Sequence, residues 1–218
     1  MADTANLSEL QELYKFFPLE GVTTNPSILK QSGMKLSVAV PQILELVGNG
    51  MIHIQVLSNH PEDILREAKK YREYFGLGNN YYVKIPVSPS GYKAMQMVKD
   101  AGMNVTATAI FTQQQALVAS KAGADFVAPY VSRLDNISSH GIEVVGDIVQ
   151  NTQVFNLHTR VLAASFKTVD QIHRTSMVGS HAATINYELL MTLIKHPMTD
   201  SSIKTFEEDG QDVYDIEF

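Results

Sequence analysis

Short strand-like segments alternate with longer helical segments along the whole chain, and this alternation limits the possible folds. The strand-like segments are rich in Val, Ile, Thr and aromatic residues, and turn residues bound them. Strands are expected at 19–24, 52–57, 81–85, 105–110, 126–130, 161–165 and 181–185, after a first strand cut very short before Asp3. Eight strand-then-helix units in 218 residues have the count and size of a (β/α)8 TIM barrel.

The helical segments fill the intervals between these strands. Helices are expected at 8–16, with Ser8 as N-cap, from 25–27 onward, and at 36–47, 61–75, 89–101, 112–122, 141–150, 168–177, 187–194 and 201–208. No linker divides the chain, so residues 1–218 are expected to form one barrel domain with an extra C-terminal helical tail from about 199. The alternative is an open doubly wound sheet, but no strand runs into a G-x-G-x-x-G or G-K-[ST] loop.

Composition excludes several classes of function. The net charge is −6 without a basic block, which argues against a nucleic-acid surface. The chain has no cysteine, no apolar run long enough to cross a membrane and no signal-peptide pattern, so we expect a cytoplasmic protein without a membrane partner. The seven histidines include no H-E-x-x-H or other close ligand pair, and G-x-S-x-G is absent. We therefore expect neither a built-in metal site nor a bound cofactor.

One lysine, Lys84, lies in the middle of the expected buried strand 81–85. Both of its neighbours, Val83 and Ile85, are apolar. Burial disfavours a charged ammonium, and a neutral amine attacks carbonyl carbons to form a Schiff base. The competing interpretation is a lysine at a strand edge whose ammonium reaches water.

Polar residues collect in or directly after the other expected strands, at the end where a barrel has its active site. They are Asp3, Thr23, Thr24, Asn25, Gln55, Thr106, Thr108, Tyr130, Arg133, Ser165 and Lys167. Each has a structural explanation when taken singly, because a buried polar group also finds partners in a core. Their joint placement at one mouth favours a site. Arg133 and Ser165 are candidate phosphate ligands there, whereas Lys167 is expected to face solvent.

Several segments of the chain, taken in order, resemble one known family. These are Asp3–Leu7, Gly21–Ser27, Val83–Val87, Ala107–Ile110, Ala122–Arg133 and Leu162–Lys167, with a weaker match at His196–Asp200. The sequence is similar to the small transaldolases and fructose-6-phosphate aldolases, which are class I aldolases on a (β/α)8 barrel. The resemblance implies sugar-phosphate substrates and a reaction without a cofactor.

The resemblance also implies a role for ten of the candidate residues, all except Thr106 and Lys167. Lys84 would form a Schiff base with the ketone of fructose 6-phosphate, and Asp3 would take the proton from the hydroxyl on the fourth carbon. Residues Tyr130, Gln55 and Thr108 would order a water that moves protons. The substrate would be held by Asn25, Ser165 and Arg133, with Thr23 or Thr24 lining the mouth.

Two positions distinguish the branches of the family. Classical transaldolases have glutamate in place of Gln55 and typically phenylalanine in place of Tyr130. The pair found here resembles the aldolase branch, which releases free dihydroxyacetone. The alternatives are a transaldolase that passes this unit to erythrose 4-phosphate, and a barrel that binds sugar phosphates without turnover.

The two ends of the chain depart from the family pattern. Members usually carry a few more residues before Asp3, so its position is less constrained by the resemblance. In the tail, Gly210 stands where members tend to have tryptophan. The resemblance implies a homo-oligomer, a pentamer or decamer, and Gly210 removes a large apolar anchor from the helix that packs between subunits.

Overall fold

Eight parallel strands form one curled sheet in the computed structural model, which describes residues 1–211 and 213–216. The strands follow one another around the sheet in sequence order. They are β1 (Ala2–Asp3), β2 (Gly21–Thr23), β3 (Met51–Gln55), β4 (Tyr81–Pro86), β5 (Asn104–Ile110), β6 (Phe126–Pro129), β7 (Arg160–Ala163) and β8 (Ala182–Ala183). A parallel bridge between Ala2 and Ile185 joins the first strand to the segment after the last, so the sheet curls back on itself. The predicted (β/α)8 fold is confirmed.

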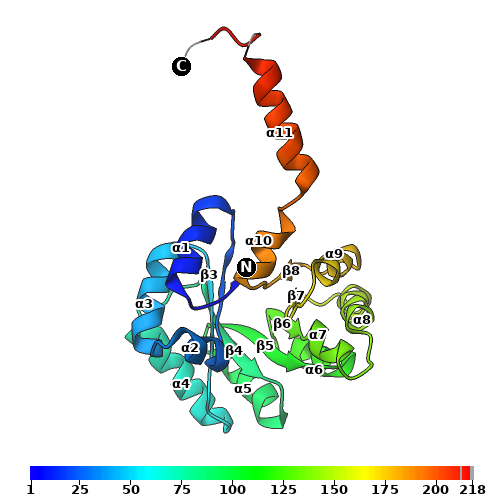
Figure 1. Cartoon of the computed structure of the whole chain (residues 1–218). Helices are drawn as coiled ribbons and strands as arrows, with labels where there is room; N and C mark the ends of the chain where they lie inside the picture. Colours follow the sequence, from blue (N-terminus) through cyan, green and yellow to red (C-terminus); the bar gives the residue numbers. More distant parts are fainter. Residues whose placement is uncertain (212, 217–218) are drawn as a thin grey trace.

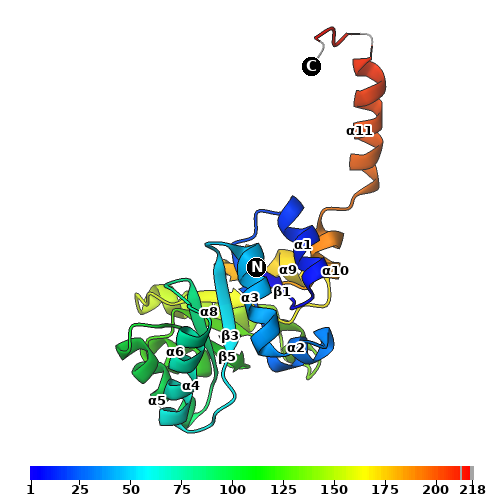
Figure 2. The same ribbon diagram turned by 90° about the vertical axis from the view of Figure 1, so that its left-hand side faces the viewer.

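Helices follow the strands and surround the sheet (Figures 1 and 2). They are α1 (Leu7–Phe16), α2 (Pro26–Ser32), α3 (Leu36–Val47), α4 (Pro61–Tyr74), α5 (Pro89–Asp100), α6 (Gln113–Lys121), α7 (Val131–Asp135), α8 (Gly141–Val154), α9 (Val169–Met177), α10 (Tyr187–Leu193) and α11 (Pro197–Gly210). Among the described residues, no helix is both long and apolar enough to cross a membrane.

Three details of the elements differ from the sequence-based expectation. The N-cap of α1 is Asn6, whose side chain accepts from the backbone N–H groups of Ser8 and Glu9, so the prediction of Ser8 as the cap was wrong. The short helix α7 was not expected, because its five residues are too few to show a helical period. The tail helix α11 begins at Pro197, four residues before the expected start, because His196 caps it with its ring nitrogen.

Alternation along each strand separates the core from the interior of the barrel. In β3, Ile52 and Ile54 are fully buried under the helices, and the intervening His53 points into the barrel. There His53 stacks on Tyr82 with ring centroids 4.6 Å apart, and Phe126 packs against both rings. These three aromatic side chains fill the interior of the barrel. Gln55 and Lys84 lie two residues further along β3 and β4 than His53 and Tyr82.

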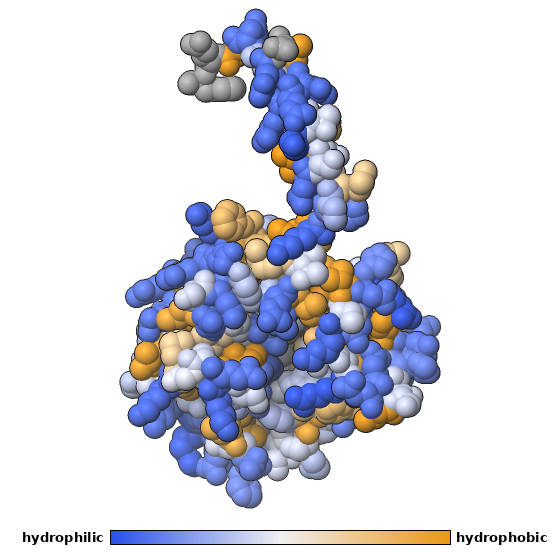
Figure 3. Space-filling model, in the orientation of Figure 1, coloured by the Kyte–Doolittle hydropathy of each residue, from blue (hydrophilic) through white to orange (hydrophobic). Residues whose placement is uncertain are grey.

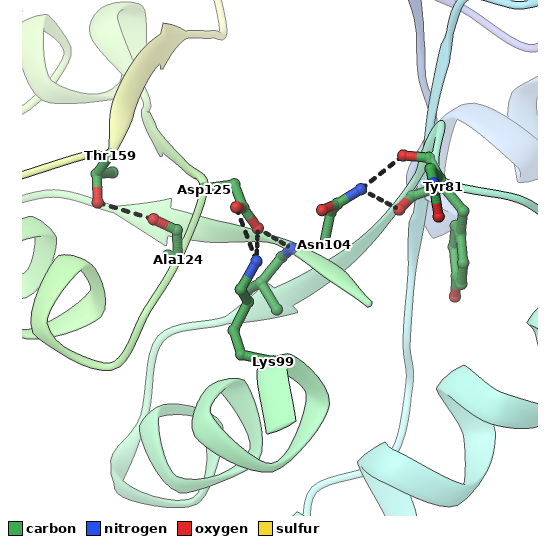
Figure 4. A network of polar contacts seen from close by, with 8 residues as sticks. Tyr81, Lys99, Asn104, Ala124, Asp125 and Thr159 are labelled. Carbon is green, nitrogen blue, oxygen red and sulfur yellow. Dashed lines mark hydrogen bonds and ion pairs between the residues drawn. The ribbon is translucent and has the colours of Figure 1, made fainter. Parts of the chain in front are cut away.

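The face of the barrel at the N-terminal ends of the strands is held by side-chain bonds to the backbone (Figure 4). Lys99 pairs with Asp125 at 2.8 Å, and the same carboxylate accepts from the backbone N–H of Val105. The hydroxyl of Thr159 donates to the carbonyl of Ala124 at 2.7 Å. These contacts join the N-terminal ends of β5, β6 and β7. A cleft lies at the opposite face, where the strands end.

The helix α11 extends away from the barrel, as both ribbon views show. Its surface is mostly hydrophilic with separate apolar side chains (Figure 3). Met198, Ile203 and Phe206 are exposed along it. Gly210 is its last residue, and the ring of Tyr214 folds back to within 3.6 Å of the position that a Cβ on Gly210 would take.

Candidate active site

A cleft of about 480 Å³ opens at the C-terminal ends of the strands. It is lined by Asp3, Asn25, Pro26, Ser27, Ile28, Gln31, Gln55, Lys84, Ala109, Tyr130, Arg133, Ala164, Ser165, Phe166, Lys167, Thr184 and Asn186. Seven of the ten predicted site residues are therefore brought to one cavity. The other three, Thr23, Thr24 and Thr108, are fully buried behind it.

Strand register explains why these side chains meet. Gln55 pairs with Lys84, and Lys84 pairs with Thr106, so three neighbouring strands present these residues at the same height. Asp3 pairs with Thr23 in the same way. Because partners in a parallel sheet point to the same face, all of them project into the barrel.

Lys84 lies at the base of the cleft with 4% of its surface exposed. Its Nζ donates to the backbone carbonyl of Thr24 at 3.2 Å, which fixes the position of the amine. The hydroxyl of Thr24 in turn donates to the carbonyl of His53. Thr24 thus acts from behind the cleft by holding the lysine, in contrast to the mouth-lining role that the resemblance implied.

Asp3 reaches the cleft from the end of β1. Its Oδ1 accepts a hydrogen bond of 2.7 Å from the hydroxyl of Thr23. Burial raises the pKa of Asp3 above its usual range, and the positive charge of Lys84 and the bond from Thr23 partly oppose this. A carboxyl group with a raised pKa in the same cleft as a buried amine is suited to take up and return protons.

Tyr130 and Gln55 line the same cavity, and Thr108 is buried behind Tyr130. The hydroxyl groups of Tyr130 and Thr108 are 3.0 Å apart. The ring of Tyr130 packs edge-on to Phe111, and the guanidinium carbon of Arg133 lies 5.0 Å from its centre. This packing fixes the ring, so the tyrosine hydroxyl is held at one place in the cleft.

The remaining predicted residues supply donors at the rim. Asn25 uses its side-chain oxygen to cap α2 through the N–H of Ile28, which leaves its NH₂ group free to donate into the cleft. Arg133 comes from the unexpected helix α7 and is exposed. Exposed Lys167 lines the cleft as well, so its wall contains a second cation besides Arg133, and Lys84 lies at its base.

Two residues of the cleft wall have an unusual backbone. Ala109 and Ser165 have φ angles of 58° and 64°, in the left-handed region that residues other than glycine rarely adopt. Ala109 falls where the register between β5 and β6 shifts. Such strained residues cluster at functional sites, where the surrounding structure holds them in place.

The sequence-based prediction missed other residues of the cavity. Thr184 follows β8 directly and Asn186 caps α10, so both lie at a strand end like the residues that were predicted. Gln31 is on α2, away from any strand, and carried no such signal. Among the described residues, no group of three His, Cys, Asp or Glu side chains is placed to hold a metal ion.

Comparison with known proteins decides which family uses this arrangement. The family model described as "Transaldolase/Fructose-6-phosphate aldolase" matches residues 1–217. The chain belongs to the transaldolase/fructose-6-phosphate aldolase family. It is therefore an enzyme, an aldolase or a transferase of the transaldolase family.

Named relatives of this family member extend over nearly its whole length. A "Probable transaldolase" of Thermoanaerobacter sp. (strain X514) is 37% identical over 207 residues, which are 95% of this chain and 94% of the relative. One of Symbiobacterium thermophilum is 37% identical over 209 residues, covering 96% and 95%. One of Clostridium perfringens is 36% identical over 207 residues, covering 95% and 94%.

Two solved structures resemble this family member in fold alone. A mandelate oxidase mutant with an FMN adduct has a TM-score of 0.57 at 14% identity, covering 86% of this chain and 63% of its own. A structure titled "Native KDPGal structure" has a TM-score of 0.55 at 14% identity, covering 84% and 75%.

Proposed function

We propose that this enzyme is a Schiff-base aldolase that cleaves fructose 6-phosphate into dihydroxyacetone and glyceraldehyde 3-phosphate, and also catalyses the reverse addition. The observation that carries the proposal is the placement of Lys84. A nearly buried amine lies at the base of a polar cleft, with Asp3, Gln55 and Tyr130 in the walls of the same cleft. Nucleophile and candidate acid–base groups thus occur together, as covalent catalysis on a ketone requires.

The proposed reaction begins with Lys84. Its amine attacks the ketone carbon, and loss of water gives a protonated imine that withdraws electrons from the neighbouring carbon. Asp3 accepts the proton of the hydroxyl on the fourth carbon, the bond between the third and fourth carbons breaks, and the aldehyde leaves. An enamine of dihydroxyacetone remains on Lys84. Its protonation and hydrolysis release dihydroxyacetone and restore the amine.

The other site residues fit the remaining steps. Tyr130 with Thr108 and Gln55 would hold the water that is lost and regained at the imine, because the tyrosine hydroxyl can donate or accept a proton. The NH₂ group of Asn25 would bind a substrate hydroxyl. Arg133 and Ser165, with Lys167 beside them, would bind the phosphate at the open end of the cleft.

A second function, transaldolase, is favoured by a specific observation. The named relatives at 36–37% identity are called probable transaldolases. In that case the enamine on Lys84 would attack erythrose 4-phosphate instead of taking a proton, and the product would be sedoheptulose 7-phosphate. We favour the aldolase because the hydroxyl of Tyr130 can donate a proton to water or carbon, whereas the neutral side chain of Gln55 can only orient its neighbours.

Borohydride trapping tests the proposed function directly. The enzyme would be mixed with fructose 6-phosphate, reduced with sodium borohydride and mapped by peptide mass spectrometry. A reduced three-carbon or six-carbon adduct on Lys84 is expected, and adding erythrose 4-phosphate would then separate the lyase from the transferase. No adduct, or one on another lysine, would favour the barrel that binds sugar phosphates without turnover.

We also propose that the enzyme assembles into a homo-oligomer, a pentamer or decamer as the family resemblance implies. The helix α11 leaves its barrel with Met198, Ile203 and Phe206 exposed, and a second copy would cover them. The ring of Tyr214 beside Gly210 offers an aromatic group near the position where the resemblance expects tryptophan. A cytoplasmic location stays our expectation.

A further inference from the structure

A chain of three side chains runs behind the cleft and reaches it at both ends. The hydroxyl of Thr23 lies 2.7 Å from Oδ1 of Asp3 and 2.6 Å from the hydroxyl of Thr184. Thr23 is fully buried, whereas Asp3 and Thr184 line the cleft. The three residues come from β2, β1 and the end of β8, which lie side by side where the sheet closes.

The direction of this chain follows from counting protons. A threonine hydroxyl has one proton and two lone pairs. When Asp3 is ionised it can only accept, so Thr23 must give its proton to Asp3. Thr23 then accepts from Thr184, whose own proton is used in that bond. Each hydroxyl polarises the next, so the bond to the carboxylate is stronger than an isolated one.

We propose that Thr23 and Thr184 are positioning residues that lock Asp3 for proton transfer, an inference that rests on the proposed function. Thr23 holds Oδ1, which leaves Oδ2 free to face the substrate hydroxyl. The two threonines also stabilise the ionised carboxylate in a site where burial favours the neutral acid. The two hydroxyl groups therefore favour the form of Asp3 that can accept the substrate proton.

The same contacts separate this role from that of Lys84. Dihydroxyacetone forms an imine with Lys84 without breaking a carbon–carbon bond. This step therefore does not need the proton transfer from the hydroxyl on the fourth carbon that is assigned to Asp3. Cleavage of fructose 6-phosphate needs both residues. Trapping with dihydroxyacetone therefore measures the reactivity of Lys84. The pH dependence of kcat/KM for cleavage depends on the ionisation of Asp3 as well.

The experiment compares four variants of the full-length enzyme. Thr184→Val removes the first hydroxyl of the chain with little change in shape, and Thr184→Ser keeps it. Thr23→Val removes the middle hydroxyl. Thr159→Val is the matched control, because it removes a buried hydroxyl bonded at 2.7 Å on the opposite face of the barrel (Figure 4).

The acidic limb of the pH profile is the decisive readout. Loss of a donor to the carboxylate favours its neutral form, so the limb should move to higher pH, by about one unit in Thr23→Val and by about half a unit in Thr184→Val. Thr184→Ser should restore the limb, and Thr159→Val should not move it. Other charged groups lie near Asp3. The charges of Lys84 and of the amino group of Met1 act on it, and Glu9 and Glu188 line a second cavity that Asp3 also borders. The substitutions leave all four groups in place.

Two results would overturn the inference. One is an unmoved acidic limb in both valine variants. The other is an equal loss of borohydride trapping and of cleavage in those variants, which would indicate general damage to the barrel. Failure of the wild-type enzyme to trap dihydroxyacetone on Lys84 would instead remove the proposed function, and the positioning role with it.

Discussion

The hydroxyl group of Tyr130, the residue directly after β6, lies 3.0 Å from the hydroxyl group of Thr108 in β5. Thr108 is fully buried, whereas Tyr130 lines the cleft. The threonine hydroxyl therefore contacts the tyrosine hydroxyl from the side away from the cleft. Phe111 and Arg133 pack on the tyrosine ring and would hold it in the same place if the hydroxyl were absent. The pair therefore allows the proton-transfer role of the tyrosine to be tested separately from its packing.

Tyr130→Phe should slow the release of dihydroxyacetone from fructose 6-phosphate by about 10²–10⁴-fold, the usual contribution of a positioned acid or base. Transfer to erythrose 4-phosphate should fall less, because the enamine then attacks an aldehyde and needs no water-derived proton on carbon. The ratio of the two products, measured by mass spectrometry, checks this. Tyr92→Phe is the control, since Tyr92 bonds to the backbone of Gln115 outside the cleft. An equal fall in both reactions would contradict the prediction.

Arg133→Lys should raise KM for fructose 6-phosphate by about tenfold or more. A lysine cannot form the paired hydrogen bonds that a guanidinium makes to phosphate, nor replace its stacking on Tyr130. Trapping with dihydroxyacetone, which carries no phosphate, should be unchanged. Steady-state kinetics of both reactions check this, with the exposed Arg174→Lys as control. Unchanged KM would place the phosphate elsewhere.

The fold was predictable because its signals are local. Most strands are short segments rich in Val, Ile, Thr and aromatic residues, and a helical segment follows them, so the barrel follows from the order of the segments. The position of Lys84 inside a strand was predictable for the same reason, but its burial was not, because the same pattern also fits a lysine at a strand edge whose ammonium reaches water. The parallel register then brings residues at strand ends together without further information.

The hydrogen-bonding partners were not predictable, because they depend on tertiary contacts. Thr23 and Thr24 look alike in sequence, yet Thr23 faces Asp3 and Thr24 turns to the backbone of β3. In the sequence, Thr184 looks like any threonine that favours a strand. Only the closure of the sheet, which brings the end of β8 next to β1 and β2, places its hydroxyl beside that of Thr23. Ser8 lost the capping role to Asn6 because two positions with equal capping preference compete within three residues.

Removal of α11 should lower the number of subunits in the assembly. A chain that ends after Lys195 lacks the exposed residues Met198, Ile203 and Phe206. Analytical ultracentrifugation should show a pentamer or decamer for the full chain and a smaller species for the shortened one. Phe206→Glu should act in the same direction, whereas Glu207→Gln should not. A monomer in every case would contradict the proposed assembly.

Asp3→Asn should abolish cleavage and at the same time stabilise the barrel at pH 7. The pKa of Asp3 is raised by burial, so the native state holds its proton at pH values where the unfolded chain has released it. Stability from this group is therefore present below the unfolded pKa of about 3.9 and is lost as pH rises through the native pKa. Asparagine avoids this loss and still accepts from Thr23.

Thermal unfolding at several pH values checks the sign of this effect. The melting temperature of Asp3→Asn should exceed that of the wild type at pH 7, because the buried carboxylate destabilises the native state and the neutral asparagine does not. The difference should shrink as pH falls below about 3.9, where Asp3 becomes neutral in the unfolded chain as well as in the native state. Asp63→Asn, at an exposed helix position, is the control. A variant less stable than the wild type at pH 7 would oppose the prediction.

His53 should make the barrel sensitive to mild acid. Burial, with the positive charge of Lys84, lowers the pKa of His53 well below its usual value, and among the described residues its Nε2 has no hydrogen-bond partner. Below pH 6.5 the unfolded chain binds a proton at this residue that the native barrel does not. Stability from His53 is therefore present above pH 6.5 and is lost as pH falls toward the native pKa.

Urea titrations at pH 7.5 and pH 5 measure this loss. The unfolded pKa near 6.5 limits the contribution of His53 to at most about 2 kcal/mol between the two pH values. His53→Gln should be less stable than the wild type at pH 7.5, because it gives up the stacking on Tyr82, but its stability should fall by about that much less on acidification. The exposed His173→Gln should retain the full wild-type dependence. The same slope in all three proteins would mean that the native barrel admits a proton at His53, which would place a second positive charge beneath Lys84.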